Sequence, residues 1–340
     1  MTDLPGGVRE ALERARGETV TAACPRVAGA NSEVWEVATA VGSRYLVKRY
    51  PHAGPGEADR LATEVAALGF MARHGVLPVP EVVCALPQER VGVFGLIEGR
   101  PLAAADIGEG EVRQAAAFLR RLHELRGAAG AGELPAAKEA CFSIAAHEAL
   151  VRARVERLRQ GSEDPALREF LERDLAPHLE RVSAWVGMTT AAAALDPRAD
   201  LEAEARTLSP SDFGFHNALR RPDGSLAFID FEYFGWDDPA KTVADFLLQP
   251  AVPVPERLRR FCGRELLGVY QPAADPGRRL SPVYALLSIK WCLIVLNLFL
   301  RAPAGADAAL RRAERLLRAR DLLGRARREF ADQAFPFDGN

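Results

Sequence analysis

The chain has 340 residues, 48% of them hydrophobic, which is enough for a globular protein of two lobes with a large core. Its 44 basic and 46 acidic residues give a formal net charge of −2, which excludes the strongly basic field that favours a nucleic-acid or membrane partner. The five cysteines are widely separated, with no Cys-x2-Cys pair, and this argues against a zinc or redox site.

The N-terminal part of the chain shows one helical pattern and then a β pattern. Residues 8–16 have the periodicity of an amphipathic helix. Strands are predicted at 20–26, 34–38 and 45–50, and the turn between the first two contains Gly29, Asn31 and Ser32. Small residues in such a turn let backbone N–H groups approach phosphates. A single glycine in a hairpin is, however, more often only a turn residue.

A lysine on the third strand and a glutamate on the following helix form the first candidate pair. Lys48 lies in the strand, and Glu64 borders the apolar stripe of a helical segment. That stripe consists of Leu61, Val65, Leu68 and Met71. In kinases a strand lysine paired with a helix glutamate holds the α- and β-phosphates of the nucleotide. The alternative is an exposed lysine and a glutamate on the helix surface.

The middle of the chain is mainly helical. A helix is predicted at 111–125, a flexible Gly- and Ala-rich loop at 127–133, and further helices between 142 and 186. His123 lies in the first of these helices. Because no nucleophile or metal partner is near it in the sequence, we interpret His123 as a structural or surface histidine.

The segment 208–245 carries three oxygen-bearing side chains at a characteristic spacing. Asp212 stands five residues before Asn217, and Asp230 follows after a predicted hairpin with strands at 218–221 and 226–229. Mg²⁺ prefers oxygen ligands and takes one or two carboxylates from its protein site. The Asp-x4-Asn spacing followed by a strand that ends in Asp-Phe is that of a kinase catalytic loop and its metal-binding aspartate.

A second interpretation of this segment fails on spacing. Asp212 also begins an Asp-Phe-Gly sequence, which is the metal motif of protein kinases. The catalytic loop would then have to begin at Asp196 or Asp200, but the residues five positions beyond them are Leu201 and Ala205, which cannot bind a metal. Asp212 is therefore better interpreted as the base, and Asp230 as the metal ligand.

After the metal aspartate the chain is again predicted to be helical. Asp238 and Pro239 are expected to cap and begin a helix that ends near residue 249. An apolar helix is predicted at 284–300, where Lys290 and Asn297 share one face and either point into an acceptor pocket or make a buried hydrogen bond. An arginine-rich helix at 308–329 follows, with a solvated outer face.

Targeting signals are not evident in this sequence. The first residues lack a basic stretch followed by an apolar core, so we expect no signal peptide. The longest apolar run, residues 291–300, is too short to cross a bilayer. We therefore expect a cytoplasmic protein.

These motifs together resemble the aminoglycoside phosphotransferase and choline kinase family. The motif most similar to the family is Ile-Asp-Phe-Glu-Tyr-Phe-Gly at residues 229–235. The resemblance implies an α+β, bilobal protein-kinase-like fold. Residues 1–98 would form a small ATP-binding lobe with an antiparallel β-sheet and one long helix, and residues 99–340 a larger, mostly helical lobe for catalysis and acceptor binding.

The resemblance also implies roles for individual residues. Asp212 would be the catalytic base, and Asn217 and Asp230 would hold Mg²⁺. Lys48, positioned by Glu64, would hold the phosphates of ATP. The nucleotide would further contact Gly29, Asn31, Ser32, Gly95 and Ile97.

This chain departs from the family at several places. The family usually has His at the positions of Pro210 and Gly214, and the displaced His216 could take over part of that role. Where relatives tend to read Asp-Pro-Ala-Tyr-Asp-Leu-Ala, residues 238–244 read Asp-Pro-Ala-Lys-Thr-Val-Ala. Asp245, the next residue, could supply the carboxylate that is lost.

The function that follows is ATP-dependent transfer of a phosphoryl group to a hydroxyl of a small molecule. The similarity of the Asp-Phe-Glu-Tyr motif to choline/ethanolamine kinases favours an amino alcohol as acceptor, but a sugar or an aminoglycoside-like acceptor fits equally well. The substitutions at Pro210 and Gly214 motivate an alternative, a catalytically inactive nucleotide-binding regulator (pseudokinase). A purely structural protein would leave the spaced charged and amide residues unexplained. The sequence makes no prediction of the oligomeric state.

Overall fold

The computed structural model describes residues 4–26, 32–54, 58–271, 276–300 and 306–337. The chain forms two compact units. Unit 1 comprises Met1–Asp106, Ala117–Lys138 and Leu208–Trp236, and unit 2 comprises Ile107–Ala116, Glu139–Thr207 and Asp237–Asn340. The lobe boundary between residues 98 and 99 remains a prediction.

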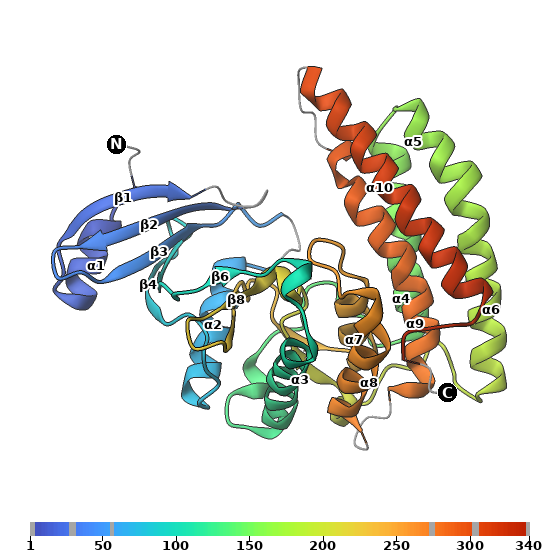
Figure 1. The fold of residues 1–340 in the computed structure, drawn as a ribbon, viewed down its shortest axis with the longest axis horizontal. Coiled ribbons are helices and arrows are strands. Elements are labelled where there is room, and N and C mark those ends of the chain that lie inside the picture. Colours follow the sequence, from blue (N-terminus) through green and yellow to red (C-terminus); the bar gives the residue numbers. More distant parts are fainter. Residues whose placement is uncertain (1–3, 27–31, 55–57, 272–275, 301–305, 338–340) are drawn as a thin grey trace. The chain divides into compact units, whose positions relative to one another are not determined.

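Unit 1 contains a five-stranded antiparallel sheet in the order β1-β2-β3-β5-β4. Its strands are β1 (Val20–Arg26), β2 (Glu33–Thr39), β3 (Arg44–Arg49), β4 (Val82–Leu86) and β5 (Val91–Gly95). Two helices accompany the sheet in Figure 1, α1 (Val8–Arg16) and α2 (Arg60–Arg73). The strands and helices predicted from residue 8 to residue 73 are therefore confirmed, with small shifts at their ends.

Alternation along the strands decides which side chains face the core and which face the candidate site. Val37 and Val47 are fully buried in a cluster with Val8 and Leu12 of α1. Successive side chains of a strand point to opposite faces of the sheet. Lys48 therefore points away from the α1 cluster, toward the other face.

The remaining strands of unit 1 flank the loops that contain Asp212 and Asp230. A three-stranded sheet in the order β6-β8-β9 consists of β6 (Arg100–Pro101), β8 (Ala218–Arg220) and β9 (Leu226–Phe228). The predicted hairpin is thus confirmed, and its turn contains Gly224 at a φ of 82°, a conformation that favours glycine. A further pair consists of β7 (Thr207–Ser209) and β10 (Gly235–Asp237).

Aromatic rings fix the loops around this hairpin. Phe118 of α3 (Glu109–Glu124) lies 5.6 Å from the ring of Phe213 and 4.7 Å from that of Phe228. Phe213 and Phe228 are also 4.8 Å apart. Such ring pairs contribute about 0.5–1.5 kcal/mol each beyond their buried area. They anchor the residues that follow Asp212 and precede Asp230.

Unit 2 is helical. Its helices are α4 (Ile144–Gly161), α5 (Pro165–Glu169), a π-helical stretch at Phe170–Leu175, α6 (Ala176–Ala192), α7 (Pro239–Leu248), α8 (Arg259–Tyr270), α9 (Gly277–Ile294) and α10 (Ala306–Ala331). Figure 1 shows α4, α6, α9 and α10 as long neighbouring helices. Across both units, short 3-10 turns occur at Ala104–Asp106, Leu125–Gly127, Ala131–Glu133, Ala203–Ala205, Phe215–Asn217, Glu256–Leu258 and Val295–Leu300.

The apolar C-terminal helix differs from its prediction. It begins at Gly277 rather than residue 284, and from Val295 it continues as a 3-10 turn. The segment Gly277–Leu300 is long and apolar enough to cross a bilayer, but 72% of its most apolar window is buried inside the protein. It contacts α4, α7 and α10, as expected for a buried core helix.

Hydrogen bonds and ion pairs hold several buried polar residues of unit 2. Asp238 caps α7 by accepting a hydrogen bond from the N–H of Ala240 at 2.8 Å, as predicted. Lys290 donates to both carboxylate oxygens of Asp245 at 2.6 and 2.9 Å. Lys290 thus makes the buried bond that was one of its two interpretations, and the carboxylate of Asp245 is engaged by it.

Candidate active site

A buried lysine and glutamate form the centre of the site in unit 1. The Lys48 Nζ lies 2.9 Å from Glu64 Oε2, as predicted. Tyr50 donates its hydroxyl to the same oxygen at 2.5 Å, and the N–H of Phe231 donates to Glu64 Oε1 at 3.1 Å. Helix α2, which carries Glu64, is capped by Asp59. Both carboxylate oxygens of Glu64 are therefore held in place.

Two further carboxylates surround the same ammonium group. Lys48 Nζ is 2.6 Å from Asp230 Oδ1 and 2.9 Å from Glu232 Oε2. The other carboxylate oxygen of Glu232, Oε1, lies 3.3 Å from Nη1 of Arg60. Burial opposes the charge on Lys48, but the three neighbouring carboxylates outweigh it and raise the pKa of Lys48. The lysine is therefore charged at neutral pH.

Asp230 occupies a strained and electrostatically unfavourable position. Burial raises the pKa of Asp230 to about 6, a rise that Lys48 opposes and that Glu64 and Glu232 increase. Its backbone has a φ of 67°, which is uncommon for a residue other than glycine. Strain of this kind concentrates at functional sites. Ligand atoms of Glu64, Asp230 and Glu232 lie within 4.8 Å of one another, so this group could hold a cation.

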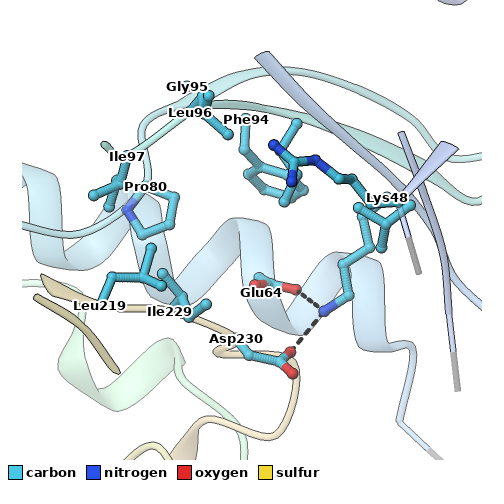
Figure 2. A pocket seen from close by; sticks show the side chains of 13 residues that line it. Lys48, Glu64, Pro80, Phe94, Gly95, Leu96, Ile97, Leu219, Ile229 and Asp230 are labelled. Atoms are coloured by element: carbon cyan, nitrogen blue, oxygen red, sulfur yellow. Dashed lines mark hydrogen bonds and ion pairs between the residues drawn. The ribbon is translucent and has the colours of Figure 1, made fainter. Parts of the chain in front are cut away.

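A cavity of about 280 Å³ opens beside this charged group. Figure 2 shows the backbone of Gly95–Ile97 along one edge, and Leu219, Ile229 and Asp230 along the opposite edge. The full lining consists of Arg26, Val34, Leu46, Lys48, Glu64, Pro80, Phe94, Gly95, Leu96, Ile97, Leu219, Ile229 and Asp230. Its size is close to the lower end for small-ligand pockets, about 300 Å³, and its apolar walls with few polar groups are typical of them.

Only some of the residues predicted to contact the nucleotide line this cavity. Gly95 and Ile97 line the cavity with Lys48. Ser32, which precedes β2, is not one of the lining residues. Gly29 and Asn31 lie outside the described residues.

Asp212 lies in the turn that leads into the hairpin. Asn217 donates its side-chain N–H to the backbone oxygen of Asp212 at 3.0 Å, and its own backbone oxygen accepts from the N–H of Ile229 at 3.0 Å. Asn217 thus connects Asp212 to the residue before Asp230. Because the amide nitrogen of Asn217 is used in the turn, its Oδ1 is the atom available to a cation.

The contacts of three residues in the site were not predicted from the sequence. Glu232 was quoted within the acidic motif, but its contact with Lys48 was not predicted. Tyr50 was placed in the third strand without a role. His216 was expected to take over part of the role of the missing histidines, but its contact with Asp212 was not predicted; its Nε2 is 3.2 Å from Asp212 Oδ1. An acidic residue two positions after the metal aspartate is the one signal that could have suggested Glu232.

Several solved structures similar to this one are described as kinases or phosphotransferases. The choline kinase from Streptococcus pneumoniae has a TM-score of 0.60 and 15% identity, covering 93% of this chain and 97% of its own. A spectinomycin phosphotransferase solved with ADP and spectinomycin has a TM-score of 0.66 and 14% identity, covering 96% and 99%. A choline/ethanolamine kinase family protein from Mesorhizobium loti has a TM-score of 0.55 and 19% identity, covering 88% and 87%.

These likenesses confirm the predicted protein-kinase-like fold class. No curated protein sequence matches the chain. Residues 23–279, however, match the phosphotransferase enzyme family over most of the chain. This chain therefore belongs to the phosphotransferase enzyme family.

Proposed function

We propose that this enzyme transfers the γ-phosphoryl group of ATP to a hydroxyl group of a small molecule. The observation that carries the proposal is the convergence of Lys48, Glu64 and Asp230 on one cavity that Gly95–Ile97 also line. The similar spectinomycin phosphotransferase was solved with ADP, which supports a nucleotide as the ligand of this cavity.

The nucleotide would bind with its base against the apolar walls and its phosphates toward Lys48. Backbone groups of Gly95–Ile97 would form hydrogen bonds to the edge of the adenine. Lys48 now donates to Asp230, so phosphate binding requires this ammonium group to exchange a carboxylate oxygen for phosphate oxygens. Glu64 would keep the lysine in place because Tyr50 and the N–H of Phe231 hold both its oxygens.

Two of the predicted site residues carry oxygen donors that suit Mg²⁺. Asp230 offers a carboxylate and Asn217 an amide oxygen, and these are ligand types that Mg²⁺ prefers. When bound, the cation would neutralise charge on the transferred phosphoryl group. Asp212 would orient the acceptor hydroxyl and take its proton, since its carboxylate is 39% exposed.

The acceptor class follows from the relatives. The similar proteins named above are described as a choline kinase, a choline/ethanolamine kinase family protein and a spectinomycin phosphotransferase. We infer an amino alcohol or a sugar-like or aminoglycoside-like molecule as the acceptor here, and a cytoplasmic location without nucleic-acid or membrane partners.

Two measurements, made one after the other, test this function. MgATP at 100 times its dissociation constant should stabilise the protein by about 2.7 kcal/mol, and this appears as a rise in melting temperature. A screen of hydroxylated metabolites with γ-labelled ATP should then identify an acceptor. A melting temperature that MgATP does not change would contradict the nucleotide assignment.

The variant Asp212→Asn tests the catalytic assignment. Loss of a general base lowers the rate by about 10² to 10⁴-fold, while the stabilisation by MgATP should stay. Asp200→Asn is the matched control, because this residue is exposed in unit 2 and was the rejected alternative for the base. Normal turnover in Asp212→Asn would refute its role. Nucleotide binding without turnover of any acceptor would instead indicate the inactive regulator.

A further inference from the structure

His216 makes a direct contact with the proposed catalytic base. The residue lies in the 3-10 turn Phe215–Asn217, and its Nε2 is 3.2 Å from Asp212 Oδ1. The side chain of His216 is 17% exposed, whereas that of Asp212 is 39% exposed. The ring thus supports the carboxylate from the protein side, while the carboxylate itself reaches solvent.

The stability of the fold does not explain an imidazole at this position. The Nδ1 atom of His216 is buried and has no hydrogen-bond partner among the residues that the structure describes. Leaving a buried polar atom unpaired costs free energy that an apolar side chain of similar size would not cost. A histidine that carries this cost is expected to have a functional reason, and Nε2 is the atom with a partner.

Backbone and side chain of Asp212 are held by different groups. The preceding residue, Ser211, has a φ of 65° and donates its hydroxyl to the backbone oxygen of Lys138 at 2.9 Å. Asn217 donates to the backbone oxygen of Asp212. Within the described part of the chain, His216 is the side chain that contacts the Asp212 carboxylate. Loss of the imidazole would therefore leave the loop in place but free the carboxylate to rotate.

We propose that His216 is a positioning residue for Asp212, and this rests on the proposed function. Its Nε2–H donates to Asp212 Oδ1 and fixes the carboxylate, so that Oδ2 is directed at the acceptor hydroxyl. His216 itself touches neither substrate nor nucleotide in this role. Its effect is on the fraction of Asp212 side chains that are oriented for proton transfer.

Two substitutions separate positioning from packing. His216→Leu keeps the bulk and removes the donor, and we expect kcat to fall about 10- to 100-fold, the range for loss of a hydrogen bond to a charged group. The KM for ATP and the melting temperature should stay close to wild type. His216→Gln places an amide donor near the position of Nε2 and should restore kcat to within about threefold of wild type.

A matched control shows whether loss of any histidine hydrogen bond has the same effect. His74 in unit 1 contacts the backbone oxygen of Ala129 at 3.0 Å through its Nε2, and His74→Leu should leave kcat unchanged. Wild-type kcat in His216→Leu would overturn the proposal. So would a folded His216→Gln variant that is as slow as His216→Leu.

An NMR measurement tests the hydrogen bond between His216 and Asp212 independently of catalytic activity. In protein labelled with ¹⁵N-histidine and free of nucleotide and metal, the Nε2–H of His216 should give a hydrogen-bonded proton resonance that disappears in Asp212→Ala. Absence of this resonance in wild type would overturn the proposal. If Asp212→Asn is inactive while His216→Leu is fully active, only this inference fails. If Asp212→Asn is fully active, the catalytic role of Asp212 fails and this inference fails with it, whereas the proposed function fails if wild type phosphorylates no acceptor.

Discussion

Replacing Asp230 by asparagine should make the metal-free protein more stable at neutral pH while it abolishes Mg²⁺-dependent turnover. Asp230 is one of three carboxylates whose oxygens lie within 4.8 Å of one another. The substitution keeps the shape and removes one negative charge. Lys48 keeps Glu64 and Glu232 as partners, so no buried charge is left unpaired.

The magnitude follows from the raised pKa. Burial raises the pKa of Asp230 from 3.8 to about 6, and roughly two units correspond to about 3 kcal/mol. The Asp230 side chain is 39% exposed, so solvent screening reduces this to about 1–2 kcal/mol. Asparagine also tolerates the φ of 67° at this position.

The sign of the pH dependence is fixed by which state binds the proton more tightly. The folded protein holds the Asp230 proton between pH 4 and 6, where the unfolded chain has lost it. Wild-type stability contributed by this group is therefore present at low pH and lost as pH rises toward 6. Asp230→Asn does not titrate, so its advantage over wild type should be small near pH 4.5 and largest above pH 6.

Urea denaturation in EDTA from pH 4.5 to 7.5 measures this difference directly. Asp212→Asn is the control, because the described contact of its carboxylate is with His216 rather than with other carboxylates. The reasoning would be refuted by an Asp230→Asn variant that is less stable than wild type at pH 7. A stability gain of equal size at every pH would also refute it, because asparagine's backbone preference alone would explain that result.

Two further substitutions test packing and acid stability. A Cβ at residue 235 would lie 2.2 Å from the backbone oxygen of Pro135, so Gly235→Ala should lower the free energy of unfolding by about 1–3 kcal/mol. Denaturant titrations measure this, and Gly132→Ala, where a Cβ has open space, is the control. Equal stability of the two variants would contradict the prediction. Burial lowers the pKa of His178 to about 4, so the unfolded state binds more protons between about pH 6.5 and 4 and wild type loses stability as pH falls through that range. His178→Leu should gain melting temperature relative to wild type over the same range, and a difference that does not change with pH would count against this.

Several elements could be predicted because their signals are local. The amphipathic period of residues 8–16 and the alternation in 44–49 each depend on a few neighbouring residues. The turn residues at 222–225 likewise determined the hairpin. The apolar helix was placed too late, since the prediction relied on its most apolar stretch, whereas the helix begins at Gly277 and includes Pro282. Burial of the whole segment overrides the helix-breaking tendency of that proline.

The sequence by itself determined the fold class, the family and the chemical types of the main site residues. Kinase-like spacing pointed to Lys48, Glu64 and Asp230, and the structure brings these together. Only the tertiary structure decided that Glu232 joins them around one ammonium group and that His216 contacts Asp212. The Lys48–Asp230 contact joins residues 182 positions apart. Contacts of this kind depend on how distant segments fold back on each other, and no local periodicity of a single chain encodes that distance.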